Sequence, residues 1–382
     1  MRKTINKLFL IITVISALLL TTGCDLFIKT NKGQVDQKWY MGLTYEDDNG
    51  NDTDYTIETD GTIAAVALED GYGDEFGIIR GEEAYLNINT IIKNIDKRFY
   101  VDATNNLVMF TDATKTYKTK IGGKTINETE NTDYVISFMD GKNCYVNVKF
   151  VKKYVDFDYK VVKAEGKSPA RIVLKYTSGE KNQMTVKSNI EMRTKADYQN
   201  LIVTTLKKNT KVTVLEESGD WTKVGTDDGF MGYVPAKKLK DKETKKTEFK
   251  SDADTYTHVL MNKKISLGWN AITNLTANGN LETIIEHTKG LNVISPTWYS
   301  LSDNKGNLRS YASATYVEKA HSKGLKVWAL VNDFGTQDKA SKEYTKKVLT
   351  DTTKRENLVD NIMTNIKDYN LDGINIDFEF IN

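Results

Sequence analysis

The stretch Asp372-Gly373-Ile374-Asn375-Ile376-Asp377-Phe378-Glu379-Phe380 decides the fold of the C-terminal part of the chain. Polar and apolar residues alternate in it, and this period of two predicts a β-strand from Gly373 to Phe380. One face would carry Asn375, Asp377 and Glu379, and the other face would carry the apolar side chains that meet outer helices. Because unpaired carboxylates inside a fold are costly, the polar face is expected to serve a site.

Upstream of this strand, the sequence alternates between strand and helix patterns, which is typical of parallel strands joined by crossover helices. Earlier strands are predicted over Ile265–Trp269, Leu291–Tyr299 and Lys326–Val331. Helices are predicted over residues 281–289, 312–323 and 357–369. This order predicts strands 1 to 4 of a (β/α)8 TIM barrel over residues 257–382. The barrel is expected to be incomplete, because a closed one takes about 250 residues.

The last strand resembles the signature DxxDxDxE of glycoside hydrolase family 18, which includes chitinases and cell-wall N-acetylglucosaminidases. Asp372, Asp377 and Glu379 match this signature, and Asn375 stands where many members have Asp. The resemblance implies substrate-assisted retention, in which the 2-acetamido group of the substrate attacks the anomeric carbon. It also implies that Glu379 protonates the leaving oxygen and that Asp377 orients the acetamido group. These four residues are the candidate catalytic set, and no cofactor is expected.

Aromatic residues near the ends of the predicted strands are candidates for sugar contacts. The segment Ser295-Pro296-Thr297-Trp298-Tyr299 is similar to the cortex-lytic branch of the same family, and Trp298 and Tyr299 are expected to stack on sugar rings. Trp269 and Asn332 complete the candidate substrate-binding set. The resemblance implies a hydrolase that cleaves β-1,4 bonds at N-acetylglucosamine in peptidoglycan, with chitin as the alternative substrate.

Residues 184–240 resemble a bacterial Src-homology-3-like domain, a small all-β barrel. The matching segments are Met192–Thr194, Thr210–Val214, Gly219–Val224 and Gly229–Val234. Such domains often hold an enzyme on peptidoglycan, and Trp221 and Tyr233 are the candidate aromatic residues of this wall module. The alternatives are a spacer without a ligand and, for the whole chain, a non-catalytic peptidoglycan-binding lipoprotein. The charged run that follows, residues 241–256, is predicted to be a solvated linker.

Residues 83–178 contain one strand and helix pattern twice, first from Tyr85 and again from Tyr145. The pattern resembles the small α+β domain at the N-terminus of copper amine oxidases, and it comes without the copper chemistry of those enzymes. Residues 24–82 form a polar, β-rich segment of uncertain role, with strand patterns at Tyr55–Ile57 and Thr62–Ala64. The chain is therefore predicted to be multidomain.

The first 23 residues have the pattern of a signal peptide, with basic residues before an apolar run from Leu8 to Leu20. The run ends in Thr21-Thr22-Gly23-Cys24, which resembles the lipobox of bacterial lipoproteins. Lipidation of Cys24 would anchor an exported protein to the outer face of the cytoplasmic membrane, where it would face the cell wall. The alternative is an ordinary secretory signal followed by a chance Cys.

The composition excludes several classes of function. Lys and Arg total 53 against 52 for Asp and Glu, so no strong field favours nucleic acid as a partner. Two Cys and three scattered His provide neither a disulfide framework nor a cluster of metal ligands. Metal sites and thiol chemistry are therefore not expected, and Cys144 is predicted to be a packed thiol.

Overall fold

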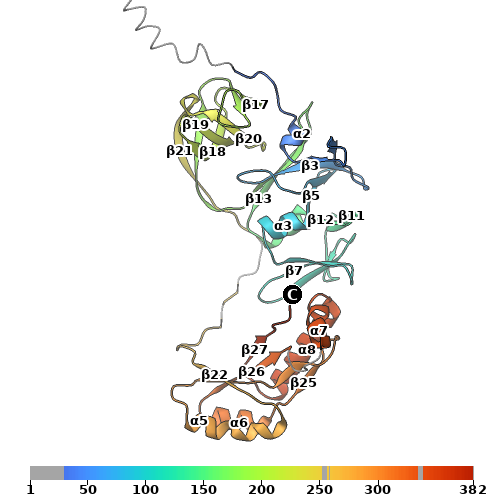
Figure 1. Ribbon diagram of the computed structural model, residues 1–382, viewed down its shortest axis with the longest axis vertical. Coiled ribbons are helices and arrows are strands. Elements are labelled where there is room, and N and C mark those ends of the chain that lie inside the picture. The colour runs from blue at the N-terminus through green and yellow to red at the C-terminus, as the bar shows by residue number, and fades with distance from the viewer. Residues whose placement is uncertain (1–29, 252–255, 258, 334–338, 382) are drawn as a thin grey trace, which may run out of the picture. The chain divides into compact units, whose positions relative to one another are not determined.

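The computed structural model describes residues 30–251, 256–257, 259–333 and 339–381, with the backbone alone for residues 339–342. The predicted signal peptide, Cys24 and residues 252–255 of the predicted linker lie outside the described residues. The chain divides into two compact units (Figure 1). The first unit comprises the described residues of Met1–Tyr100 and Phe110–Asp254, and the second comprises those of Val101–Met109 and Thr255–Asn382. No helix among the described residues is long and apolar enough to cross a membrane.

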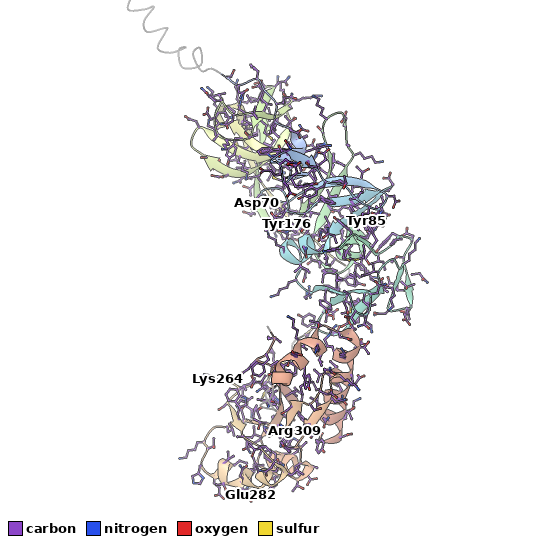
Figure 2. The ribbon with its side chains drawn as sticks, turned by 45° about the vertical axis from the view of Figure 1, so that its right-hand side comes forward. Asp70, Tyr85, Tyr176, Lys264, Glu282 and Arg309 are labelled. Carbon is purple, nitrogen blue, oxygen red and sulfur yellow. The ribbon has the colours of Figure 1, made fainter. Side chains whose placement is uncertain are left out.

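A seven-stranded sheet forms one half of the first unit, with the strand order β11-β12-β5-β4-β3-β14-β13. Its strands are β3 (Thr62–Ala67), β4 (Gly77–Arg80), β5 (Glu83–Asn87), β11 (Ser137–Asp140), β12 (Asn143–Asn147), β13 (Asp158–Val162) and β14 (Ala170–Lys175). Strands β3 and β14 run parallel, and the other pairs are antiparallel. Tyr85 of β5, labelled in Figure 2, packs edge to face on Phe138 of β11, with 4.9 Å between ring centroids.

The predicted repeat is present in this sheet. Strand β5 leads into helix α3 (Ile88–Asn94), and β12 leads in the same way into helix α4 (Val148–Tyr154). Each helix begins after an Asn whose side chain accepts a hydrogen bond from the backbone N–H two residues later, Asn87 in one case and Asn147 in the other. An Asn at this position satisfies one of the free N–H groups of the first helical turn, which explains why both strands change to helix at the same point of the pattern.

The expected boundary between residues 82 and 83 is wrong. Strands β3 and β4 come from the segment of uncertain role, yet they lie in the middle of the sheet that also contains β5. Gly77 makes this close packing possible, because a Cβ atom there would lie 2.5 Å from Cδ1 of Ile172. The strand expected at Tyr55–Ile57 is also displaced, since the structure has β2 at Asp52–Asp54, paired with β1 (Thr44–Glu46).

Smaller elements complete the first half of the chain. They are helix α2 (Gln37–Tyr40), a three-stranded sheet of β6 (Phe99–Asp102), β7 (Leu107–Thr111) and β8 (Thr116–Lys120), and the pair β9 (Thr125–Ile126) and β10 (Glu130–Asn131).

A second seven-stranded sheet contains the predicted small barrel, with the strand order β17-β16-β20-β19-β18-β15-β21. Its strands are β15 (Gly179–Val186), β16 (Ile190–Arg193), β17 (Ile202–Leu206), β18 (Lys211–Ser218), β19 (Trp221–Gly225), β20 (Met231–Pro235) and β21 (Leu239–Thr247), with a 3-10 helix η1 (Ala236–Lys238) before the last strand. One hydrophobic cluster extends from Ile78 and Tyr85 of the first sheet to Met192 and Val234 of the second. The two sheets therefore share a core.

The linker prediction is wrong for residues 241–247. They belong to β21, which pairs antiparallel with β15 from Gly179↔Thr247 to Val186↔Leu239. The run is too polar to pack a core, but a strand needs only backbone partners and can leave its charged side chains in water. Lys242 and Glu243 form ion pairs with Glu217 and Lys211, respectively, on β18.

The second unit contains a mainly parallel sheet in chain order. Its strands are β22 (Leu267–Asn270), β23 (Val293–Pro296), β24 (Tyr299–Leu301), β25 (Leu308–Ser310), β26 (Lys326–Asn332) and β27 (Gly373–Asp377). Strands β22, β23, β26 and β27 are parallel neighbours in that order, and β24 continues β23 along the same side of β26. This arrangement confirms the predicted succession of parallel strands.

Helices follow the strands as the sequence pattern indicated. They are the 3-10 helix η2 (Leu275–Asn280) and the α-helices α5 (Leu281–Glu286), α6 (Ala314–Ser322), α7 (Lys339–Leu349) and α8 (Thr352–Asp368). Helix α6 stops before Gly324, whose φ of +75° is a left-handed conformation that suits glycine. Helix α7 was not predicted, and α8 begins at Thr352 instead of Asn357 because the Asp351 side chain caps it by accepting from the Lys354 N–H.

Candidate active site

The carboxyl ends of the parallel strands meet at one edge of the sheet in the second unit. The register pairs Asn270 of β22 with Pro296 of β23, and Asn332 of β26 with Asp377 of β27. Polar side chains thus end three of the four parallel strands, β22, β26 and β27, at the edge where barrels and open α/β sheets carry their sites. We call this edge, with the residues directly beyond it, the candidate active site.

Strand β27 is shorter than the sequence pattern predicts. It ends at Asp377, so Glu379 and Phe380 lie outside the strand. Their backbone N–H groups donate to the carboxylate of Asp333, at 3.0 Å from Glu379 N to Oδ1 and 2.9 Å from Phe380 N to Oδ2. The strand ends here because a side chain takes the hydrogen bonds that a neighbouring strand would otherwise receive.

Asp333 was missed by the sequence interpretation. It directly follows β26 and is 0% exposed, and Thr345 Oγ1 of α7 donates to its Oδ2 at 2.9 Å. A usable signal was present in the sequence, because the polar residues Asn332 and Asp333 stand at the end of an apolar strand. Asp377 stands at the corresponding end of the next predicted strand.

The candidate catalytic residues Asn375, Asp377 and Glu379 lie along one short segment. Asn375 Nδ2 donates to Oγ of the buried Ser295, at 3.4 Å. Asp377 is partly buried and Glu379 is exposed. Carboxyl groups at the carboxyl edge of a parallel sheet can give and take protons in acid and base chemistry.

Asp372 is not brought together with these residues. It precedes β27, so it lies at the opposite end of the strand from Asp377, about 16 Å away at the usual rise per residue. Its carboxylate accepts hydrogen bonds from Lys326 Nζ at 2.6 Å and from the Val327 N–H at 2.9 Å, and it pairs with His321 Nε2 at 2.7 Å. Burial opposes ionisation, but these partners outweigh it and lower the pKa of Asp372. Asp372 thus joins α6, β26 and β27 at the amino end of the sheet.

The structure corrects the expectation that Trp298 and Tyr299 stack on sugars. Trp298 is 0% exposed, Tyr299 is also buried, and both belong to the hydrophobic core of the unit. Trp298 Nε1 donates to Asn278 Oδ1 at 2.7 Å, and its ring lies edge to face on Tyr316 at 5.1 Å. A buried Trp requires such a partner for its N–H, and this one finds it inside the protein.

The other two candidate substrate contacts remain at the edge. Trp269 of β22 is 68% exposed. Asn332 is buried beside Asp377 in the register, and its Oδ1 has no hydrogen-bond donor among the described residues. A buried acceptor without a donor is unusual in proteins, and it favours a contact with a group from outside the described residues.

The aromatic candidates of the wall module are partly buried in the first unit. Trp221 lies edge to face on Tyr198, with 4.8 Å between centroids, and Tyr233 pairs with Lys223 and Arg193 on the neighbouring strands.

The sequence interpretation missed a recess formed by helix α2 and the segment before β17. It is lined by Val35, Trp39, Tyr40, Thr194, Lys195, Gln199, Asn200 and Leu201, and Trp39 is 54% exposed there.

The described residues contain no cluster of His, Cys, Asp and Glu that could hold a metal ion. Cys144 of β12 is buried, and burial raises the pKa of its thiol to about 12. It is therefore a packed thiol in the structure, as the sequence predicted.

Comparison with known proteins identifies the small barrel. Residues 188–240 match the family described as bacterial SH3 domain, within the predicted range 184–240. A search of curated proteins found no match to the chain.

Several solved structures are similar to part of the chain. A C-terminal domain from Desulfitobacterium hafniense, provisionally described as a chitinase, is 25% identical at a TM-score of 0.26, over 31% of this chain and 34% of that one. A chitinase from Chromobacterium violaceum is 15% identical at a TM-score of 0.25, over 31% and 36% of the two chains. A chitinase from Bacteroides thetaiotaomicron is 20% identical at a TM-score of 0.25, over 30% and 36%. This chain spans about a third of the length of each of them.

Proposed function

We propose that the chain is a glycoside hydrolase of the family 18 type, which cleaves β-1,4 bonds at N-acetylglucosamine in peptidoglycan. The observation that carries the proposal is the edge formed by β26 and β27, where Asp377 pairs with Asn332 and Glu379 is tethered through its backbone to Asp333. Two carboxyl groups two residues apart at the carboxyl end of a parallel strand are the arrangement that the family signature requires.

The proposed reaction needs no nucleophile from the protein. Glu379 donates its proton to the glycosidic oxygen as the bond to the anomeric carbon breaks, and the acetamido oxygen of the substrate bonds to that carbon. Asp377 accepts a hydrogen bond from the acetamido N–H and stabilises the positive oxazolinium ring. Glu379 then takes a proton from water, which attacks the same carbon and restores the acetamido group with retention of configuration. Asn375, in place of the usual Asp, supplies an amide that cannot share a proton with Asp377.

Substrate contacts are proposed for two residues of the edge. Trp269 offers an exposed indole on which a sugar ring can stack, and Asn332 offers the acceptor that lacks a donor. Chitin is the second candidate substrate, since its bonds also lie beside N-acetylglucosamine.

The test is the release of reducing ends by the full chain from purified peptidoglycan and, in parallel, from chitin. Glu379→Gln is expected to abolish release, because an amide cannot donate the catalytic proton. Glu286→Gln is the matched control, since Glu286 is an exposed Glu on α5 of the same unit. Equal release by the wild-type and Glu379→Gln proteins would contradict the proposal.

A second candidate function is peptidoglycan binding without catalysis. The bacterial SH3 match and the recess around Trp39 favour it. In this case the wild-type protein sediments with peptidoglycan sacculi but releases no reducing ends from either polymer. Trp39→Ala is expected to weaken sedimentation, since exposed aromatic residues in a recess are common binding anchors.

Further proposals concern the rest of the chain. We propose that residues 1–23 are a signal peptide and that a lipid on Cys24 holds the protein at the outer face of the cytoplasmic membrane. The first seven-stranded sheet with its repeated strand and helix, which begins at β3, is proposed to be a surface module like that of copper amine oxidases. Residues 257–382 are proposed to be the first half of a TIM barrel. Labelling of cells with radioactive palmitate, compared between the wild-type protein and Cys24→Ala, tests the anchor.

A further inference from the structure

We infer that Asp333 is a positioning residue for Glu379, acting through the main chain of the segment that follows β27. The inference rests on the proposed function, because it concerns the group that would donate the proton. It is carried by three hydrogen bonds to one carboxylate: from Glu379 N, from Phe380 N and from Thr345 Oγ1.

The two backbone contacts use both oxygens of the carboxylate. Oδ1 accepts from Glu379 N at 3.0 Å, and Oδ2 accepts from Phe380 N at 2.9 Å. A carboxylate held this way fixes the planes of two successive peptide groups, and hydrogen bonds to an ionised acceptor are about twice as strong as neutral ones. The Cα–Cβ direction of Glu379, which lies between these peptide groups, is therefore set by Asp333 although the strand has already ended at Asp377.

The position of Asp333 is itself well determined. It follows β26 directly, the strand on which β27 is paired over Trp328↔Gly373 to Asn332↔Asp377. Thr345 of α7, also buried, holds Oδ2 from the side of the helix. We call the Asp333 carboxylate and its three hydrogen bonds, from Glu379 N, Phe380 N and Thr345 Oγ1, the clamp. The clamp ties the end of β27 to the end of β26 and to α7.

The burial of this charge argues for a role in the site. Asp333 is 0% exposed, and no Lys, Arg or His forms a salt bridge with it among the residues that the structure describes. An ionised group buried with neutral partners costs stability. Proteins keep such a cost where a catalytic group must be held in place, because a displacement of that group by about 1 Å can lower the reaction rate on the order of 100-fold.

The first measurement is amide hydrogen exchange by NMR in the full-length wild-type chain, labelled with ¹⁵N-Glu, ¹⁵N-Phe and ¹⁵N-Ile. The amides of Glu379 and Phe380 are expected to exchange at least tenfold more slowly than that of the exposed Ile381. Equal exchange of all three amides would overturn the clamp, whether or not the protein is an enzyme.

The second measurement uses Asp333→Asn, which keeps the shape but replaces one acceptor oxygen by an NH₂ group that faces an N–H donor. The variant is expected to lose the slow exchange of one or both amides. It should lower kcat for reducing-end release on the order of 10-fold or more, with KM unchanged, because the substrate contacts remain.

Asp112→Asn is the matched control, because Asp112 also accepts from two backbone N–H groups and a Thr hydroxyl, Thr114 N, Lys115 N and Thr114 Oγ1, but lies in the other unit. The kcat of Asp112→Asn should equal that of the wild-type protein.

If Asp333→Asn fails to fold, the wild-type exchange measurement still decides on the clamp. If the wild-type protein releases no reducing ends but shows slow exchange at Glu379 and Phe380, the proposed function fails and the clamp stands. Slow exchange with an unchanged kcat in Asp333→Asn would refute positioning.

Discussion

Trp298 offers the clearest test of how the second unit uses its aromatic residues. The sequence places it on a sugar-binding surface, whereas the structure places it in the core with 0% exposure. Truncation to Ala removes the whole indole, including the hydrogen bond to Asn278 and the ring contact with Tyr316. Trp298→Ala is therefore expected to destabilise the second unit by about 3–5 kcal/mol, the usual range for a buried aromatic residue.

This loss is a large part of the stability of an ordinary domain, which is about 5–15 kcal/mol. Because the chain has two compact units, hydrogen exchange followed by mass spectrometry is a better assay than a single melting curve. Peptides from residues 265–301 and 314–333 should exchange faster in Trp298→Ala, while peptides from β3, β4 and β5 keep their wild-type rates.

Trp269→Ala is the control for the same residue type. Its indole is 68% exposed, so exchange should stay at the wild-type level while binding to N-acetylglucosamine oligomers weakens. Unchanged exchange in Trp298→Ala, together with a loss of oligomer binding, would show that Trp298 faces the ligand and would refute the structural assignment.

Two further predictions concern stability. Asp102, buried within the second unit, accepts from Thr352 N at 2.6 Å, and although burial opposes its ionisation, hydrogen bonds from Thr352 and Asn105 lower its pKa to about 2. Against an ordinary pKa near 4, this shift contributes at most about 2.5 kcal/mol to the free energy of unfolding. The contribution is fully present above pH 4 and is lost as the pH falls through 2. Asp102→Asn should therefore destabilise the unit at pH 7 and cost progressively less below pH 4, as measured by urea unfolding across this range. Gly77→Ala should destabilise the first unit by about 1–3 kcal/mol, because the new methyl group would lie 2.5 Å from Ile172 Cδ1 and 2.9 Å from Tyr85 O; a wild-type unfolding midpoint would contradict this.

Local patterns were sufficient for most elements of the chain. The succession of parallel strands in the second unit, the repeated change from strand to helix after Asn87 and Asn147, and the stop at Gly324 follow from periodicity and capping. These signals are local, because each depends on residues within one or two turns or on one strand face. The alternation from Gly373 onward likewise identifies the segment that holds Asp377 and Glu379.

The remaining features depend on contacts between distant residues. The sequence alone determined that Asp377 and Glu379 share a segment at the end of a strand, but the tertiary structure decided that Asp333, 46 residues before Glu379, fixes the second of them. It also decided that Trp298 is core while Trp269 is surface, and that the charged residues of β21 form a strand because β15 offers a partner. Burial and strand pairing are set by what lies opposite a residue in space, and neighbouring letters do not carry that information.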